Sequence, residues 1–284
     1  MKWISEESIL IVGLGLIGGS YARALKRLGF HVAAIDINQE SIDYALENGI
    51  IDEGYTTVEP AVVSNADVVV FGLYPTVFKE WIVQYQQFLK PGAMLTDVTG
   101  VKSCIVYDIQ DMLRPDVEFI AAHPMAGKEV YGVQNSDEHI FHDANYIVVP
   151  TEKNTPEAIE WCRSLGMILG FNHIAVLSPE KHDEMIGFVS QLTHIIAVSL
   201  MECSDDHSLV DYTGDSFRDL TRIARINDKM WSELFMMNKK ELLAQMDRFI
   251  SVFQDFRNML ASDDVEGMRA AMRVSTERRA WFDR

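Results

Sequence analysis

Ile9-Leu-Ile-Val-Gly13-Leu-Gly15-Leu-Ile-Gly18 is an apolar run that ends in three glycines at fixed spacing, and it decides the fold. A strand, a glycine turn and a following helix-like pattern are together typical of a dinucleotide-binding unit. Gly13 permits the turn, Gly15 lets a pyrophosphate approach the backbone, and Gly18 lets the helix pack closely on the strand. The start of that helix offers free N–H groups and partial positive charge to phosphate. We therefore expect a dinucleotide to bind at Gly13, Gly15, Leu16, Ile17 and Gly18.

The acidic residue Asp36 indicates which dinucleotide to expect. His31-Val-Ala-Ala-Ile-Asp36 predicts a second strand, and Asp36 follows the glycines by roughly 20 residues, where a carboxylate accepts hydrogen bonds from ribose hydroxyls. A carboxylate there repels a 2′-phosphate, so the pattern favours NAD over NADP. A third predicted strand, residues 66–71, leads into a loop at a strand end, where such folds hold ligands. We expect three residues of this loop to contact the cofactor: Leu73, Pro75 and Thr76.

The composition is that of an ordinary globular protein. The chain has 284 residues, of which 48% are hydrophobic and 24% are charged, and this length fits two domains of common size. Its 42 acidic and 25 basic residues give a net charge of −17, which disfavours binding to nucleic acid or to an anionic membrane surface. The same field repels an anionic substrate, so a few local Arg, Lys or His side chains must capture one.

Cysteine usage and apolar patterning bear on the compartment. Cys104, Cys162 and Cys203 are far apart and form no CxxC pair, which predicts a reducing compartment and no disulfide. No spacing of ligand residues suggests a metal site. Residues 1–7 lack the apolar core of a signal peptide, and no apolar run approaches transmembrane length. We therefore expect a cytoplasmic protein without a membrane partner.

Strand and helix patterns alternate through the first part of the chain. Further strands are predicted at residues 93–97, 117–122, 144–149 and 171–176, with helical patterns before most of them. This alternation predicts an α/β fold with a doubly wound, mainly parallel Rossmann-type sheet. From Ser178 onward, apolar residues recur at helical spacing and no convincing strand follows. We expect a dinucleotide-binding domain at residues 1–175 and an all-helical domain at residues 176–284.

His123 is the strongest candidate for catalysis. It follows the predicted strand 117–122, so the winding of the sheet places it near the nicotinamide end of the cofactor. Imidazole in that position can accept a proton from a hydroxyl near neutral pH while the carbon beneath it loses hydride. The alternative is a loop histidine that hydrogen-bonds to the backbone.

Charged side chains of the helical part are candidates for substrate binding. Arg218, Arg222 and Arg225 lie close together, and an Arg fork suits a carboxylate. The alternative is a solvated helix face on which they pair with nearby acids. His182 and His194 lie on one apolar-periodic helix, either as core histidines or as contacts of an anion between the two domains.

Several segments together resemble the prephenate/arogenate dehydrogenase family, and the resemblance spans nearly the whole chain. Gly13 to Ser20 is similar to the family's first turn, and Asp97-Val-Thr-Gly-Val-Lys102 to its Asp-x-x-Ser-x-Lys loop. His123-Pro-Met-Ala-Gly127 resembles its His-Pro-x-Ala-Gly loop. His182-Asp183 and Ser190-Gln-Leu-Thr-His194 resemble its His-Asp and Ser-His-Leu-Pro-His segments. Phe217-Arg-Asp-Leu-Thr-Arg-Ile-Ala224, followed by Met230-Trp231, resembles its Phe-(Arg/Lys)-Asp-x-Thr-Arg-Ile-Ala…Met-Trp signature.

The resemblance implies a reaction of tyrosine biosynthesis. NAD takes hydride from the ring carbon that bears the 4-hydroxyl of prephenate, the ring carboxylate leaves as CO₂, and aromatisation gives 4-hydroxyphenylpyruvate. The resemblance implies His123 as the base on that hydroxyl, Arg222 on a substrate carboxylate, and His194 near the substrate. It also implies Trp231 as a neighbour of the pocket, although packing between helices would explain this residue equally well. Finally, it implies a homodimer formed through the helical domain.

Two departures from the family pattern concern the substrate pocket. Gly100 stands where the family has Ser, so a hydroxyl that could bond His123 or the substrate is missing. We expect the adjacent Thr99, or a water, to replace it, and we place Thr99 and Gly100 beside the substrate. Gln191 and Thr193 replace a His and a Pro of the Ser-His-Leu-Pro-His segment, which leaves the choice between prephenate and arogenate open.

Three other functions fit parts of the sequence. One is arogenate dehydrogenase, whose substrate carries an amine in place of the side-chain keto group. Another is a non-catalytic NAD-sensing protein that lost its chemistry through Gly100, against which His123 and Arg222 argue. The third is a different hydroxyacid dehydrogenase, a class that often relies on a Lys of the helical domain, and no well-placed Lys is evident here.

Overall fold

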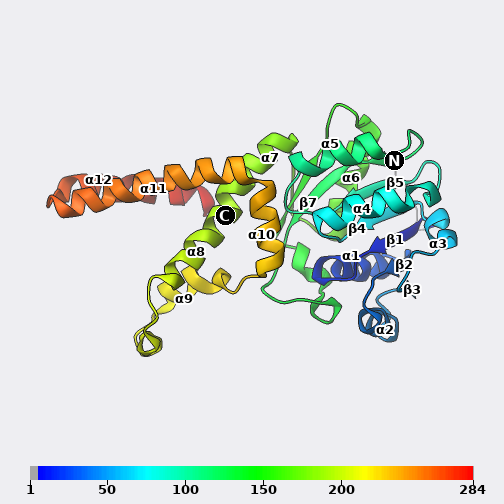
Figure 1. Cartoon of the computed structure of the whole chain (residues 1–284), viewed down its shortest axis with the longest axis horizontal. Helices are drawn as coiled ribbons and strands as arrows, with labels where there is room; N and C mark the ends of the chain where they lie inside the picture. Colours follow the sequence, from blue (N-terminus) through cyan, green and yellow to red (C-terminus); the bar gives the residue numbers. More distant parts are fainter. Residues whose placement is uncertain (1–5, 284) are drawn as a thin grey trace.

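The computed structural model describes residues 6–283 and contains an α/β part followed by an elongated helical part (Figure 1). The interpretation of the N-terminus as lacking a signal peptide rests mainly on residues 1–5, which lie outside the described residues. The α/β part contains the glycine turn, and the helical part extends away from it (Figure 1).

A six-stranded parallel sheet forms the centre of the α/β part. Its strand order is β3-β2-β1-β4-β5-β6, so the order reverses between β1 and β4, where doubly wound sheets bind ligands. The strands are β1 (Ser8–Val12), β2 (His31–Ile35), β3 (Glu53–Tyr55), β4 (Val68–Phe71), β5 (Met94–Asp97) and β6 (Glu118–Phe119). This arrangement confirms the predicted Rossmann-type sheet.

Helices cover both faces of this sheet, which explains why the central strands are continuously apolar over residues 9–12 of β1 and throughout β4. Along β1, Ile9 and Ile11 join one core cluster with helices α1 (Leu16–Arg27) and α6 (Pro156–Leu169). Leu10 and Val12 point the other way and pack with α4 (Pro75–Tyr85) and α5 (Ser103–Met112). A strand buried on both faces needs apolar residues at every position. Helices α2 (Gln39–Glu47) and α3 (Pro60–Asn65) complete this part.

A second, three-stranded sheet was not predicted. It contains β7 (Ala121–Met125), β8 (Asn145–Val149) and β9 (His173–Val176), with β7 antiparallel to β8. The prediction of one strand at 117–122 was wrong, because β6 and β7 belong to different sheets. The Ile120 N–H still bonds to Leu95 of β5, but the Ala122 N–H bonds to the Asp97 side chain at 3.1 Å. Asp97 therefore marks the point where the chain leaves the first sheet.

The remaining chain is helical, as predicted, and no strand follows Val176 up to residue 283. α7 (Pro179–Ile186), a π-helical turn (Gly187–Leu192) and α8 (Thr193–Glu202) form one continuous helix. α9 (Asp215–Thr221) and α10 (Asp228–Met237) lead to α11 (Lys239–Ala261), and α12 (Val265–Arg279) folds back along it. Figure 1 shows α11 and α12 projecting away from the sheet.

The helix Pro179–Glu202 corrects one prediction. Its 24 residues, with mean hydropathy 1.4 in the most apolar window, are long and apolar enough to cross a membrane by length and composition alone. The statement that no apolar run approaches that length was therefore wrong. The core helix of a soluble protein also passes this test, although only 28% of this window is buried within the chain.

Candidate active site

The glycine turn between β1 and α1 is tightly packed on one side and open on the other. Gly13 has φ +98°, and a Cβ there would lie 2.6 Å from the Gly72 carbonyl oxygen. A Cβ on Gly18 would lie 2.0 Å from the Gly13 carbonyl oxygen, whereas a Cβ on Gly15 would meet no atom within 4 Å. Gly15 thus faces open space. No side chain among the described residues caps α1, so the first N–H groups of the helix, including those of Leu16 and Ile17, are oriented to receive phosphate.

Asp36 lies at the end of β2 beside this turn. Its Oδ2 accepts the Leu14 N–H at 2.6 Å, and its Oδ1 accepts the Asn38 N–H at 2.8 Å. Each carboxylate oxygen can accept more than one hydrogen bond, so the group remains able to bind ribose hydroxyls. Its bond to Leu14 also holds the glycine turn in place, which the sequence did not indicate.

The loop after β4 contacts the helical part. The Thr76 N–H and Oγ1 both donate to Oε1 of Glu233 on α10, at 3.0 and 2.6 Å. The Tyr74 hydroxyl accepts from Asn227 at 3.3 Å. A cofactor contact to either Thr76 donor would have to displace Glu233. The expected cofactor contacts of Leu73, Pro75 and Thr76 stay predictions.

His123 on β7 belongs to a chain of three side chains. Its Nδ1 lies 2.9 Å from Nε2 of His182, and Nδ1 of His182 lies 2.8 Å from Oδ1 of Asp183. His182 and Asp183 come from α7 and are buried, while His123 is half-buried. From the sequence, His182 was expected only as a core residue or an anion contact, and Asp183 had no predicted role. The adjacent His-Asp pair was the available signal.

Burial and hydrogen bonds determine the charges of His123, His182 and Asp183. Burial raises the pKa of Asp183, but the hydrogen bonds from His182 and Ser103 outweigh it and hold the pKa below its usual value. Burial lowers the pKa of His182 despite its bond to Asp183. Burial, with smaller contributions from His182 and Lys102, lowers the pKa of His123 well below 6.5. His123 is therefore neutral near pH 7 and can accept a proton.

Lys102 is fully buried behind His123. Its Nζ donates to Asp97 Oδ2 at 2.7 Å and to the Ala122 carbonyl at 2.6 Å, so its charge is paired inside the protein. The Thr99 hydroxyl belongs to the same cluster and donates to Asp97. Thr99 is only 4% exposed. The buried Asp97–Lys102 pair engages this hydroxyl, and the expectation that it replaces the missing serine beside the substrate stays a prediction.

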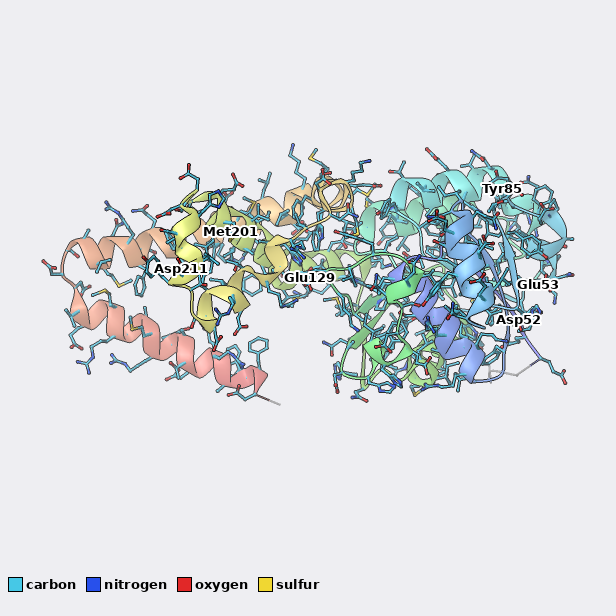
Figure 2. All side chains as sticks on the ribbon, turned by 90° about the horizontal axis from the view of Figure 1, so that it is seen from below. Asp52, Glu53, Tyr85, Glu129, Met201 and Asp211 are labelled. Carbon is cyan, nitrogen blue, oxygen red and sulfur yellow. The ribbon has the colours of Figure 1, made fainter. Side chains whose placement is uncertain are left out.

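Arg222, Glu129 and His194 lie together where the two parts meet. Arg222 Nη1 is 2.5 Å from Glu129 Oε1, and Figure 2 shows Glu129 at the junction between the α/β part and the helices. His194 stacks on Trp231 with ring centroids 3.8 Å apart and donates to the Ser190 carbonyl. Burial lowers the pKa of His194, while the Ser190 bond and the Glu129 charge oppose that shift. Glu129 was not predicted as a site residue, although it lies only two residues beyond the His-Pro-Met-Ala-Gly loop.

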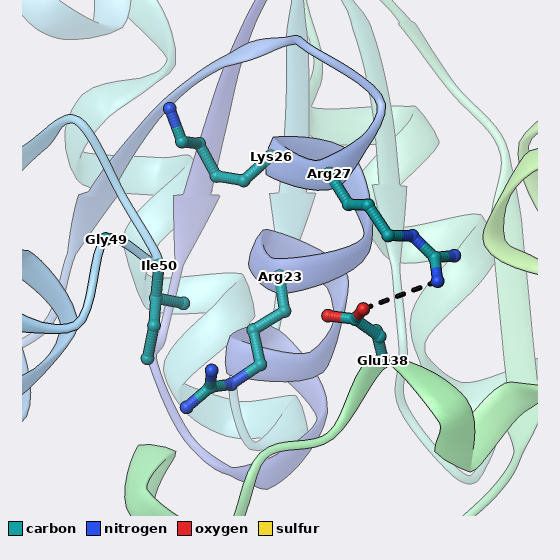
Figure 3. A pocket seen from close by; sticks show the side chains of 6 residues that line it. All are labelled: Arg23, Lys26, Arg27, Gly49, Ile50 and Glu138. Carbon is teal, nitrogen blue, oxygen red and sulfur yellow. Dashed lines mark ion pairs between the residues drawn. The ribbon is translucent and has the colours of Figure 1, made fainter.

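A basic hollow of about 290 Å³ lies elsewhere, at the C-terminal end of α1 (Figure 3). Lys26 pairs with Asp52 at 2.6 Å and Arg27 with Glu138 at 3.3 Å, so two of its cations are neutralised. It lies at the opposite end of α1 from the glycine turn and is no part of the candidate active site. Its lining residues are Arg23, Lys26, Arg27, Gly49, Ile50 and Glu138.

Comparison with known proteins identifies the family. A family model described as prephenate dehydrogenase, nucleotide-binding domain, matches residues 21–170, and one described as prephenate dehydrogenase, dimerization domain, matches residues 178–274. The chain belongs to the prephenate dehydrogenase family. This membership confirms the predicted resemblance, and with it an NAD-dependent oxidoreductase.

Individual relatives of this prephenate dehydrogenase family member cover most of its length. Prephenate dehydrogenase of Bacillus subtilis (strain 168) is 31% identical over 276 residues, which are 93% of this chain and 72% of the relative. Cyclohexadienyl dehydrogenase of Zymomonas mobilis is 29% identical over 266 residues, 91% of this chain and 90% of the relative. A crystal structure of prephenate dehydrogenase from A. aeolicus in complex with hydroxyphenyl propionate and NAD⁺ has a TM-score of 0.90 at 30% identity, and covers 99% of this chain and 100% of that chain.

Of the two departures from the family pattern, one lies beside His123. A Cβ on Gly100 would lie 3.9 Å from His123 Cε1 and 3.5 Å from Leu234 Cδ1, which are ordinary contacts. A serine would therefore fit at Gly100. In its absence, the hydrogen bond to His182 is the side-chain bond that orients His123 within residues 6–283.

The other departure, Gln191, is a buried residue that supports the backbone of the site. Gln191 is buried in the π-helical turn, where its Nε2 donates to the Leu234 carbonyl at 3.2 Å. Its Oε1 accepts from Asn238, whose Nδ2 also donates to the Asp183 carbonyl at 2.9 Å. Gln191 therefore ties the start of α11 to α7 and supports the backbone at Asp183. Gln191 stands where the family has a histidine. The replacement therefore alters a buried supporting contact, and it does not alter a side chain that faces the open site.

Proposed function

We propose that the chain catalyses the NAD-dependent oxidative decarboxylation of prephenate to 4-hydroxyphenylpyruvate. The observation that carries this proposal is His123, a neutral and half-buried imidazole on β7 of the second sheet, beside the side-chain-free Gly100. The open face of the glycine turn at Gly15 fits the pyrophosphate of NAD. We propose Gly13, Gly15, Leu16, Ile17, Gly18 and Asp36 as residues that hold it.

Bound NAD⁺ would supply the hydride acceptor for the ring carbon that carries the hydroxyl. His123 accepts the hydroxyl proton, so the oxygen can form a carbonyl as the C–H electron pair departs. The C–CO₂ bond then breaks, its electron pair enters the ring, and the oxygen takes the proton back from His123 as CO₂ leaves, which gives the phenol. Because the product ring is aromatic, the protein has mainly to orient the reactants and to accept one proton.

Arg222 is the proposed contact for a substrate carboxylate. A dianionic substrate in a chain of net charge −17 needs a local cation, and the guanidinium can bind a carboxylate bidentately. In the structure Glu129 occupies this guanidinium, so the substrate would exchange with or displace Glu129. We propose that His194, Trp231 and Gly100 line the same pocket.

Arogenate is the second candidate substrate, and Glu129 is the observation that favours it. The carboxylate lies beside Arg222 and influences His194, so it could pair with the ammonium group that arogenate carries in place of the keto group. Glu129→Gln would then raise the KM for arogenate, whereas the KM for prephenate would not rise, because the substrate carboxylate no longer competes with Glu129 for Arg222.

We further propose a cytoplasmic homodimer formed through the helical part, with the division between the two domains at residues 175 and 176. The proposal is supported by the large apolar side chains that remain exposed in the single chain. Packing within the core of one chain does not explain so many of them. Examples are Val252 at 64%, Phe253 at 67% and Trp281 at 71% exposed. The matching dimerization-domain model, residues 178–274, covers the first two.

The test is NADH formation by the purified chain with prephenate or arogenate and with NAD or NADP. His123→Asn should lower kcat by roughly 10²-fold or more, the usual contribution of a general base. His173→Asn is the matched control, because His173 is exposed on β9 and contacts none of these groups. Absence of turnover with both substrates would refute the proposal, and an unchanged kcat in His123→Asn would refute the role of His123.

A further inference from the structure

We infer that His182 and Asp183 are positioning residues that fix which nitrogen of His123 carries hydrogen, and so direct its proton-accepting Nε2 toward the substrate. This inference rests on the proposed role of His123 as the base. It concerns two residues that contact neither cofactor nor substrate in the proposal. Both come from α7 of the helical part, whereas His123 comes from β7.

Asp183 is the member of this hydrogen-bonded series whose protonation state is fixed. Its Oδ1 accepts the Lys102 N–H at 2.9 Å, and its Oδ2 accepts the Ser103 N–H at 2.9 Å, at the start of α5. Backbone N–H groups can only donate, and the positive end of the α5 dipole favours negative charge there. Asp183 is therefore a carboxylate that can only accept, and its bond at 2.8 Å requires hydrogen on Nδ1 of His182.

The position of one hydrogen then determines the next. A neutral His182 with hydrogen on Nδ1 presents a lone pair at Nε2, which lies 2.9 Å from Nδ1 of His123. His123 must donate from Nδ1 to make this bond, so its own Nε2 keeps a free lone pair. The other charged groups near the two rings are Lys102 and Asp97, and they neutralise each other through a bond of 2.7 Å.

No other side chain in the described part of the protein performs this task. Gly100 lacks a hydroxyl, and the Thr99 hydroxyl is bonded to Asp97. Without His182, the His123 ring could rotate or exchange its hydrogen between the two nitrogens. The contact between α7 and the start of α5 therefore determines which ring nitrogen of His123 carries no hydrogen.

The first test reads the hydrogen positions directly in the full chain without substrate. Nitrogen-15 NMR of histidine-labelled protein near pH 7 should show His123 and His182 neutral, both with hydrogen on Nδ1. Signals are assigned from His123→Asn and His182→Asn. Hydrogen on Nε2 of His123 would overturn the inference. Since this readout needs no turnover, its failure is distinct from failure of the proposed function, which only the activity assay decides.

The second test compares two carboxylates of α7 that both contact α5. Asp183→Asn gives His182 an amide that can donate, and should lower kcat for prephenate roughly 10²-fold with little change in KM. The matched control is Glu180→Gln, because Glu180 accepts from the Tyr107 hydroxyl at 2.5 Å and touches neither histidine. A kcat within about threefold of the control would overturn the inference.

A third variant covers the case in which Asp183→Asn fails to fold. His182→Gln leaves the Asp183 bonds to α5 in place and should reduce kcat similarly, because Gln can either donate to or accept from His123. Wild-type kcat in folded His182→Gln would overturn the inference. A purely structural role predicts a lower melting temperature with kcat per folded molecule unchanged.

Discussion

Two glycines of the same turn should respond in opposite ways to the same substitution. A Cβ on Gly18 would lie 2.0 Å from the Gly13 carbonyl oxygen, although ordinary carbon–oxygen contacts begin at roughly 3.3 Å. The backbone would have to move by more than about 1 Å. The Gly13 N–H bond to Ile35 at 2.8 Å and the positive φ of Gly13 both resist that movement.

The magnitude for Gly18→Ala follows from two opposing contributions. Overpacking costs about 1–3 kcal/mol, and a clash with backbone belongs at the upper end. Alanine is better than glycine inside a helix by about 1 kcal/mol. The net loss of about 2 kcal/mol should lower the melting temperature by about 4–8 °C in a chain of this size.

Gly15→Ala should leave the fold intact and weaken cofactor binding. Gly15 has φ −77° and ψ −164°, which alanine can adopt, and its Cβ would meet no atom within 4 Å. Stability should change by no more than about 1 kcal/mol. The methyl group would occupy the space where the pyrophosphate approaches, so NAD affinity should fall about tenfold or more.

Thermal unfolding without cofactor and calorimetric titration with NAD measure both quantities for each variant. A Gly15→Ala variant that binds NAD as tightly as the wild type would show that the phosphates do not pass over Gly15. A Gly18→Ala variant with an unchanged melting temperature would refute the packing of the turn.

Three further predictions concern the active site. The acidic limb of kcat/KM should have its midpoint below pH 6.5, because burial holds the pKa of His123 well below that value and only its neutral form accepts a proton; a midpoint above pH 6.5 would contradict this. Arg222→Ala should raise the KM for prephenate about tenfold or more with little change in the KM for NAD, and a wild-type KM would reassign the carboxylate site. Asp36→Ala should shift selectivity toward NADP, since the repulsion of the 2′-phosphate is lost, and unchanged selectivity in steady-state assays would exclude the ribose contact.

Local patterns predicted most of the main sheet, because β1, β2 and β4 are short, mainly apolar segments followed by a turn or a helix. The edge strand β3, Glu53-Gly-Tyr55, was not predicted, because it has no apolar run. The second sheet could not be predicted from such patterns. Residues 117–122 read as one strand, and only the Asp97 side chain, which bonds to the Ala122 N–H, separates β6 from β7. That contact joins residues 25 positions apart and leaves no trace in hydrophobic periodicity.

The active site was predictable where a residue's position in the chain determined its place in the fold. His123 was found because it follows a strand, and Asp36 because its distance from the glycines is typical. The bonds of the Thr99 hydroxyl to Asp97 and Lys102 could not be predicted, because sequence does not give the direction of a loop side chain and buried Lys102 requires acceptors around it. The bond between His182 and His123 is a tertiary contact, so the local His-Asp pair alone did not reveal it.

Of the helices that begin at the carboxyl edge of the main sheet, α1, α4 and α5 differ in what binds their N-termini. Asp183 accepts the first N–H groups of α5, and Glu233 accepts the Thr76 N–H in the first turn of α4. Both carboxylates come from the helical part. No side chain within residues 6–283 caps α1, whose first turn follows Gly15. Since a helix N-terminus favours negative charge, the helical part occupies two of these positions and leaves the third for the cofactor phosphates. The same contacts that join the two parts therefore leave the nucleotide site open and hold His182 against His123.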